Sequence, residues 1–377
     1  MPSHDLPTGR LTKVILHLDR LSHNMQLLQQ QVGQTPLWPC IKANAYGHGA
    51  RIFAEHLLQL GYDTFGVADV GEAVELIDAG IDARFMIFSA TLPEHSEALV
   101  AYDCEPAVCT LEMVQALARE AGKRDKPMSI HIKVDTGMGR IGIYPEQVQA
   151  FIEKCEDYPS VRIRGIMSHF PRADEADKAF SYQQIETFKG VADVARRHGI
   201  ELCHMANSAA ILDLPEARFD VARPGIAIYG LRPSPTIQNP AVGRLKPVLE
   251  WKSRITFLKE VPAGTGLSYG HMYKTERPSL IATVPVGYGD GLSRNLSGKV
   301  DFLAGGLRCP QVGRITMDMS LVDVTALRGR VALGDEVVII GVQQAAEITA
   351  DELADKLGTI NYEIVTAISQ RVPRIDV

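Results

Sequence analysis

The stretch PLWPCIKANAYGHGARIFAEHLLQL, residues 36–60, contains the pattern that decides the fold. Its first part, 36–41, is short and largely apolar and predicts a buried strand. Its last part, 51–60, has apolar residues at helical spacing and predicts an amphipathic helix. Lys42 therefore lies at a strand-to-helix junction, which is where α/β enzymes place catalytic groups.

The same alternation of strand and helix patterns continues to about residue 230. Helical patterns lie between the strands, for example at 71–78, 112–121 and 180–198. Seven further strand candidates occupy 64–68, 84–88, 105–108, 129–134, 162–167, 202–205 and 219–223. Eight such βα units in about 200 residues predict a closed (β/α)₈ barrel. An open doubly wound sheet is the alternative, although no G-x-G-x-x-G pattern opens the first helix.

The pattern changes after Pro233. Four segments read as strands separated by glycine-rich turns, namely 252–259, 280–286, 320–324 and 336–340, and they predict a mainly β second domain. One helix interrupts it, with Thr349 and Glu352 as a capping box and Gly358 as the stop signal. We place the domains at 1–244 and 245–377, and residues 14–19 fit either.

Composition limits the possible partners. The net charge of −6 and the isoelectric point near 6.0 argue against a nucleic-acid or anionic-membrane surface. The chain has no N-terminal secretion pattern and no apolar run of spanning length, so we expect no membrane association and a cytoplasmic location. Its six cysteines include no C-x-x-C pair, which favours reduced thiols and no metal site.

Candidate catalytic residues follow the predicted barrel strands. Lys42, Arg140, His169 and Arg223 come after the first, fifth, sixth and eighth strands, and Asn207 and Ser208 come after the seventh. Each could be structural alone, but carboxyl ends of barrel strands share one face, so together they indicate a site. A partly desolvated lysine amine can condense with an aldehyde, and pyridoxal phosphate is the cofactor that uses such an amine.

A phosphate group requires hydroxyls and backbone N–H groups. Ser208, the turn at Gly225 and Ile226, and the phenol of Tyr46 provide groups of these types. Two other glycine-rich segments, 264–270 and 287–291, lie between predicted strands without a following helix, so they are weak phosphate loops.

Nine blocks carry a resemblance that covers both domains. They are IKANAYGHG, KVDTGMGRIG, SHF, ANSAA, RPGIAIYG, LSYG, GYGDG, GRITMDMS and INYE. In content and order they resemble those of alanine racemases, which are pyridoxal-phosphate enzymes of fold type III. The resemblance implies interconversion of L- and D-alanine, which supplies D-alanine for bacterial peptidoglycan, by a homodimer with shared active sites.

The resemblance also implies roles for individual residues. Lys42 would hold pyridoxal 5'-phosphate and act as the base on the D side, and Tyr269 of the partner subunit would act on the L side. Arg223 would face the pyridine nitrogen, with His169 hydrogen-bonded behind it. Arg140 would orient the substrate carboxylate, with support from Lys133, which is often a carbamate in this family.

The remaining implied contacts fall into three groups. The phosphate would be held by Tyr46, Ser208, Gly225, Ile226 and Tyr362, with Asn207 beside them. The substrate carboxylate would meet the backbone N–H of the partner subunit's Met317, next to Asp318. The entrance would be formed by Tyr288, Asp174, Arg294 and Arg314.

Two positions depart from the family pattern. Thr316 stands where relatives often have cysteine or serine, and Met319 where glutamine is common, both near the expected substrate pocket. Tyr362, in contrast, is typical of alanine-selective members.

Two other functions fit part of the chain. A fold type III decarboxylase would also carry a substrate-binding cysteine motif. A pyridoxal-phosphate carrier would be a barrel alone and would not explain the second domain.

Overall fold

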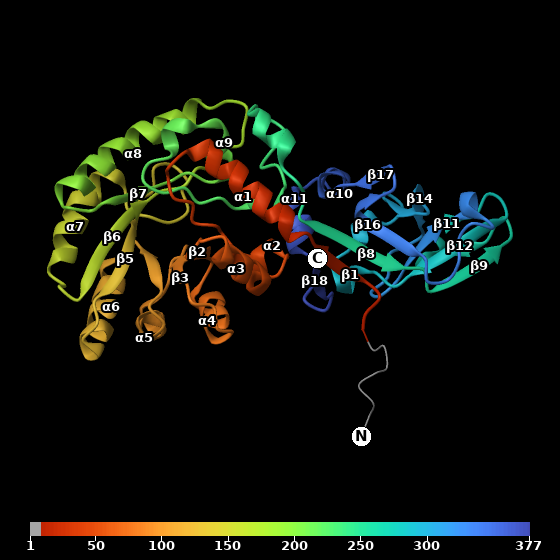
Figure 1. Cartoon of the computed structure of the whole chain (residues 1–377), viewed down its shortest axis with the longest axis horizontal. Coiled ribbons are helices and arrows are strands. Elements are labelled where there is room, and N and C mark those ends of the chain that lie inside the picture. Colours follow the sequence, from red (N-terminus) through yellow and green to blue (C-terminus); the bar gives the residue numbers. More distant parts are fainter. Residues whose placement is uncertain (1–8) are drawn as a thin grey trace, which may run out of the picture. The chain divides into compact units, whose positions relative to one another are not determined.

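The structure is a computed structural model that describes residues 9–377. It contains two compact units (Figure 1). The barrel unit comprises residues 19–45 and 50–247, and the β unit comprises residues 9–18, 46–49 and 248–377. This division differs from the expected boundary at 244/245, because two short segments from the first part of the sequence belong to the β unit.

The barrel unit is built on parallel strands in sequential order. Its six regular strands are β2 (Thr64–Val67), β3 (Arg84–Ile87), β4 (Glu105–Val108), β5 (Met128–Lys133), β6 (Val161–Met167) and β7 (Leu202–His204). Every residue of β2 and β4 is buried. Strands with both faces covered read as continuous apolar runs, which is the pattern found in the sequence.

Two irregular segments close the barrel. Cys40 pairs with Gly66 of β2, and Leu37 pairs with Ala222, both in parallel. The backbone N–H of Arg223 donates to the carbonyl of Ala206 at 2.9 Å, which continues the ring toward β7. The segment 36–41 is no regular strand because Pro36 and Pro39 have no N–H to donate. All eight predicted strand positions are thus present, and the predicted barrel is confirmed.

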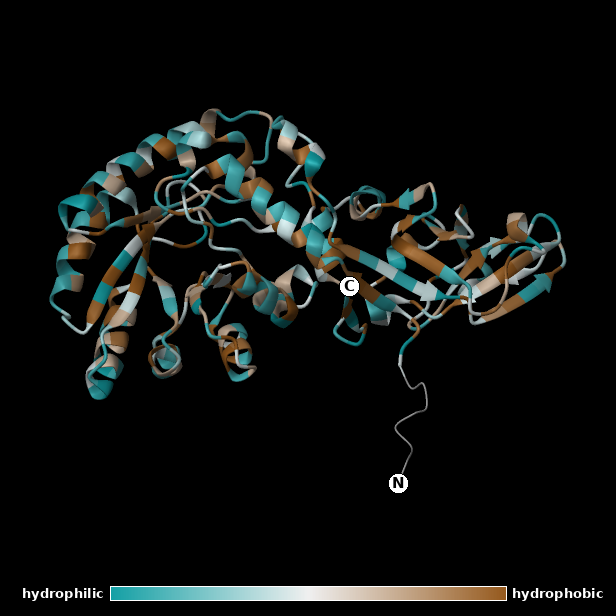
Figure 2. Ribbon diagram, in the orientation of Figure 1, coloured by the Kyte–Doolittle hydropathy of each residue, from teal (hydrophilic) through white to brown (hydrophobic). Residues whose placement is uncertain are grey.

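Helices cover the outer side of the barrel strands (Figure 1). They are α1 (Leu18–Val32), α3 (Ala50–Gln59), α4 (Val70–Asp78), α5 (Ser96–Ala101), α6 (Leu111–Arg124), α7 (Val148–Glu156), α8 (Ala179–Arg197) and α9 (Ser208–Asp213). Figure 2 shows apolar and hydrophilic residues on different sides of the longer helices. Such amphipathic helices bury one side against a sheet. No helix within residues 9–377 combines the length and apolar character needed to cross a membrane.

The β unit contains a ten-stranded sheet. Its strands are β1 (Lys13–Leu16), β8 (Leu249–Arg254), β9 (Phe257–Val261), β12 (Ser279–Val284), β13 (Asp301–Ala304), β14 (Leu307–Val312), β15 (Ser320–Asp323), β16 (Glu336–Gln343), β17 (Ala346–Ile348) and β18 (Arg374–Asp376). A separate hairpin pairs β10 (Gly266–Leu267) with β11 (Tyr273–Lys274). The mainly β second domain is therefore confirmed, although the predicted strand 252–259 is broken into β8 and β9.

Both segments that join the β unit have clear contacts in it. Val14 of β1 pairs with Trp251 and with Arg374. The carbonyl of Gly47 accepts a hydrogen bond of 2.7 Å from Arg374, and a Cβ atom at Gly47 would lie 2.1 Å from the Val365 carbonyl oxygen. Only glycine permits that approach and its φ of +82°.

Two short helices complete the β unit, α10 (Ala350–Leu357) and α11 (Asn361–Thr366). The Thr349 side chain accepts a hydrogen bond from the Glu352 N–H, and Gly358 ends α10 in the left-handed conformation, as predicted. The Glu352 carboxylate binds Arg308, so the second half of the predicted capping box is replaced by this ion pair.

Candidate active site

The residues predicted at the barrel strand ends form one electrostatic cluster. Burial lowers the pKa of His169 well below its ordinary value, and the positive charges of Arg223, Lys133, Arg140 and Lys42 lower it further. The largest charge effects on His169 thus come from cations. A neutral imidazole surrounded by four cationic side chains forms a site that attracts an anion.

Lys133, at the end of β5, is a buried lysine of the cluster. Burial lowers its pKa to about 8, and the charges of Arg223 and Arg140 lower it as well, whereas the charge of Asp135 opposes this shift. Its Nζ donates to the Val134 carbonyl at 3.0 Å. A large share of this amine is therefore neutral just above physiological pH.

Lys42 is followed by a left-handed turn, and the predicted helix begins after it as α3 (Ala50–Gln59). Ala43, Asn44 and Ala45 have φ values of 51°, 52° and 53°, a conformation that costs energy for residues with a Cβ atom. The Ala45 N–H donates to the Ile41 carbonyl at 2.7 Å, and the Asn44 side chain accepts from the Ala50 N–H at 2.8 Å. These bonds hold a strained backbone next to the candidate covalent lysine.

The charges of Lys42 and Arg223 both affect the Cys40 thiol. Burial raises the pKa of the Cys40 thiol to about 11, and the charges of Lys42 and Arg223 oppose this shift. The Arg223 guanidinium donates to the Ser168 carbonyl at 2.8 Å and to the imidazole of His204. The hydrogen bond that we expected from His169 is thus made by His204, which the sequence did not single out.

The predicted phosphate contacts of the barrel unit also meet. The Ser208 hydroxyl oxygen accepts from the N–H groups of Gly225 at 2.8 Å and Ala227 at 3.3 Å, and Ile226 begins the short turn η4 (Ile226–Tyr229). The Asn207 side chain accepts from the Ala210 N–H at 3.0 Å. Asn207 is thus the N-cap of α9, and its side-chain oxygen is used in this cap.

The other two predicted phosphate contacts lie in the β unit. The rings of Tyr46 and Tyr362 pack with centroids 6.0 Å apart. Tyr362 is the second residue of α11. The structure therefore pairs these two phenols, which are far apart in the sequence.

Tyr269 lies in the short turn η6 (Tyr269–His271) of the β unit and is 70% exposed. It lines an open pocket of about 500 Å³ together with Thr316 and Met319, the two positions that depart from the family pattern. Ser268, with a φ of 59°, donates to the Arg314 carbonyl at 2.7 Å and so fixes the start of the turn. An exposed phenol beside an open pocket is available to a second molecule.

The expected entrance residues are divided between the two units. Tyr288, in η7 (Tyr288–Asp290), Arg294, in η8 (Arg294–Leu296), and Arg314 lie in the β unit. Asp174 lies in the barrel unit, where its carbonyl accepts from the Thr236 hydroxyl at 2.5 Å.

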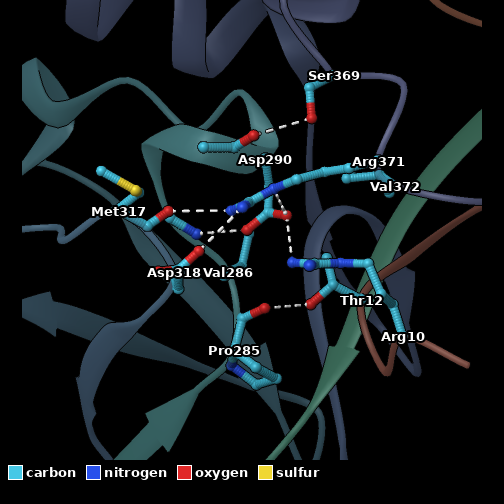
Figure 3. A network of polar contacts seen from close by, with 12 residues as sticks. Arg10, Thr12, Pro285, Val286, Asp290, Met317, Asp318, Ser369, Arg371 and Val372 are labelled. Atoms are coloured by element: carbon cyan, nitrogen blue, oxygen red, sulfur yellow. Dashed lines mark hydrogen bonds and ion pairs between the residues drawn. The ribbon is translucent and has the colours of Figure 1, made fainter. Parts of the chain in front are cut away.

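A buried carboxylate holds the loop that contains Met317 and Asp318 (Figure 3). Asp290 is fully buried and accepts from Arg10 at 2.5 Å and from the Nε of Arg371 at 2.9 Å. Arg371 also donates to the Met317 carbonyl at 3.2 Å and pairs with Asp318 at 2.9 Å. Neither Asp290 nor Arg371 stands out in the sequence as a candidate site residue. Asp290 lies in the GYGDG block, so this residue of the block connects the loop to Arg10 and Arg371.

Asp290→Asn is expected to loosen the loop, because the amide keeps the shape but removes the charge that binds both arginines. A broken buried ion pair costs about 3 kcal/mol, so we expect a thermal midpoint several degrees lower and a higher KM. Calorimetry and initial rates measure both quantities. The control is Asp355→Asn, at an exposed position on α10. Equal thermal midpoints for the two variants would contradict the role of Asp290 in holding the loop.

Comparison with known families matches both units. The family described as "Alanine racemase, N-terminal domain" matches residues 16–233, and "Alanine racemase, C-terminal domain" matches residues 248–376.

Known proteins resemble the chain over nearly its whole length. The alanine racemase of Halothermothrix orenii is 44% identical and that of Clostridium novyi 41%, over 97% and 96% of this chain and 96% and 94% of theirs. An alanine racemase structure from Clostridium difficile has a TM-score of 0.92 at 35% identity, covering 97% of this chain and 96% of that one. One from Bacillus anthracis, with bound L-Ala-P, has a TM-score of 0.91 at 35% identity, with 99% and 96% covered.

Proposed function

The chain belongs to the alanine racemase family, and we propose that it interconverts L-alanine and D-alanine with pyridoxal 5'-phosphate through two opposed bases, Lys42 and Tyr269. The observation that carries the proposal is the group of four cationic side chains around a neutral His169. Such a group fits an anionic cofactor and a substrate carboxylate, and Lys42 adds the amine that the cofactor aldehyde requires.

The residues present fit the cofactor. We propose that its phosphate is held by Ser208, Gly225, Ile226, Tyr46 and Tyr362, with Asn207 maintaining the α9 cap. When bound, the cofactor supplies a ring that withdraws electrons from the α-carbon. Arg223 would face its ring nitrogen. Burial lowers the pKa of Arg223 only to about 10, so the guanidinium stays charged at neutral pH and leaves that nitrogen without a proton.

Racemisation removes the α-proton from one face and returns a proton to the other, so it needs an acid–base group on each side. We propose that the Lys42 Nζ serves the D side and the Oη of Tyr269 of the partner subunit serves the L side. Arg140 and the backbone N–H of the partner subunit's Met317, next to Asp318, would orient the substrate carboxylate. The entrance would be formed by Tyr288, Asp174, Arg294 and Arg314.

The family also suggests roles for the two domains and a location in the cell. We propose a cofactor domain within residues 1–244 and a domain within 245–377 that contributes Tyr269 to a partner, in a homodimer. The six cysteines, all of which are free, support a cytoplasmic location. The proposed role there is to supply D-alanine for peptidoglycan.

Incubation of the purified protein with L-alanine, L-serine and L-lysine in turn, followed by chiral chromatography, tests the function. We expect D-alanine to form fastest. Thr316 and Met319 line the pocket beside Tyr269, so the rate with serine measures how far these departures broaden the substrate range. Release of carbon dioxide without D-alanine would overturn the proposal.

Lys133→Ala is expected to raise the KM for alanine by about 3- to 10-fold with little change in cofactor content, because Lys133 would support Arg140. As an ammonium, Lys133 repels Arg140; as a carbamate, it would attract it. Initial rates and cofactor absorbance measure the two effects, with the exposed Lys154→Ala as the control. An unchanged KM would reduce Lys133 to a structural strut.

The pKa of Lys133 near 8 sets the pH dependence of that carbamate. Only the neutral amine reacts with carbon dioxide, and its fraction grows as the pH rises through 8. At fixed dissolved carbon dioxide, carbamate occupancy is therefore expected to increase between about pH 7 and 9, as measured by carbon-13 NMR with labelled carbon dioxide.

The shared site predicts complementation between two inactive variants. Lys42→Ala lacks the base of the barrel unit, and Tyr269→Phe lacks that of the β unit, so a mixed dimer regains one intact site. Mixing the two proteins under conditions of subunit exchange is expected to restore part of the activity. If exchange is verified and no activity returns, both bases come from one chain.

A further inference from the structure

The barrel interior contains a line of polar side chains that runs from Arg223 to Glu105. Arg223 donates to the Nδ1 of His204, the Nε2 of His204 lies 3.0 Å from the Nδ1 of His131, and the Nε2 of His131 lies 3.0 Å from a Glu105 oxygen. The second Glu105 oxygen binds Arg164. Both histidines are fully buried. We call this line the relay.

Chemistry fixes the direction of every hydrogen bond in the relay. A guanidinium can only donate, so the Nδ1 of His204 accepts and its Nε2 carries the hydrogen. That hydrogen is donated to His131 Nδ1, so the hydrogen of His131 lies on Nε2 and is donated to Glu105. Burial lowers the pKa of both histidines. Two neutral imidazoles thus connect a cation to a carboxylate.

The surroundings hold the two imidazoles in place. The Trp38 ring packs edge-on against His131 and His204, with centroids 5.7 Å and 5.4 Å away. A Cβ atom at Gly165 would lie 2.6 Å from the Nδ1 of His131, so glycine leaves the space that this ring occupies. Such packing prevents the ring rotations that would reverse the hydrogen bonds.

Glu105 is the carboxylate at the far end of the relay. Burial raises its pKa, but the hydrogen bond from His131 and the charge of Arg164 outweigh that effect and keep the net pKa below its ordinary value. Within residues 9–377, Arg223 makes its hydrogen bonds to His204 and to carbonyls, with no carboxylate among them. A buried cation without a counter-charge is costly.

We propose that Glu105 is a positioning residue for Arg223, acting through His131 and His204. The proposal deepens the proposed function, on which it rests, because there Arg223 faces the cofactor ring. Glu105, which is paired with Arg164, is the charged acceptor that ends the relay at the amino end of β4, and the relay fixes which edge of the guanidinium is occupied. The remaining N–H groups of Arg223 are thereby held in one orientation.

The first test uses the cofactor-free protein with nitrogen-15 histidine. NMR, with each histidine signal assigned to its residue, is expected to show His131 and His204 neutral at pH 7, both with the hydrogen on Nε2. In Glu105→Gln, the Nε2 proton of His131 should move upfield because a neutral acceptor makes a weaker bond. Histidines that all titrate, or that carry the hydrogen on Nδ1, would overturn the relay whatever the enzyme does.

The second test uses the cofactor-loaded enzyme. Glu105→Gln is expected to lower kcat about tenfold, since a bond to a charged group is weakened, with the KM for L-alanine unchanged and the absorbance maximum of the cofactor shifted. The matched control is Glu120→Gln, which removes a carboxylate of α6 paired with Lys123 and Arg124. Unchanged kcat and absorbance in Glu105→Gln would overturn the positioning role. Absence of racemisation in the unmodified enzyme would overturn the proposed function alone, because the NMR result decides the relay independently.

Discussion

Lys42→Ala is expected to reduce racemisation by on the order of 10⁴-fold or more, because one side chain would both hold the cofactor and move the proton on the D side. The left-handed turn after Lys42 is held by bonds of Ala45 and Asn44 that the substitution leaves intact. The variant should therefore fold and fail only in chemistry. Chiral chromatography measures the rate.

The control for this variant is Lys126→Ala, which removes a surface lysine paired with Asp103. Borohydride reduction of the unmodified enzyme, followed by peptide mapping, should label Lys42 and give no label in Lys42→Ala. A cofactor label on another lysine would remove Lys42 from its proposed role.

Tyr269→Phe is expected to lower racemisation by on the order of 10²–10⁴, the usual contribution of one acid–base group. The substitution deletes only a hydroxyl from a ring that is 70% exposed, so neither stability nor cofactor content should change. Tyr144→Phe, at another exposed tyrosine, is the control.

Isotope exchange separates the two faces in Tyr269→Phe. With Lys42 still present, the variant should exchange the α-hydrogen of D-alanine with deuterated solvent faster than that of L-alanine, whereas the unmodified enzyme exchanges both. Equal residual exchange from the two enantiomers would mean that one base or water serves both faces, and the opposed pair would be abandoned.

The sequence by itself predicted the barrel because its signals are local. The period of apolar residues distinguishes strand from helix within a few residues, and Thr349 and Gly358 mark the ends of α10 through bonds within one turn. The carboxyl ends of parallel strands share one face. Strand order alone therefore placed Lys42, Arg140, His169 and Arg223 in a common site.

Only the tertiary structure decided the features that depend on distant partners. Strand β1 is four residues long and joins the sheet through Trp251 and Arg374. The left-handed turn after Lys42 contradicts the preference of its own residues and is held by bonds outside it. Arg371 reaches Asp290 across the β unit.

The relay illustrates the physical reason. His204, His131 and Glu105 lie on three strands of the barrel, and each reads alone as an ordinary polar residue. Pairing of β4 to β7 in one sheet, with Gly165 leaving space on β6, brings them within hydrogen-bonding distance. The inability of arginine to accept a hydrogen bond then fixes their tautomers. The order of the strands and the residues on them can be predicted from local sequence. The hydrogen-bond partners of those residues depend on the packed geometry of the whole barrel.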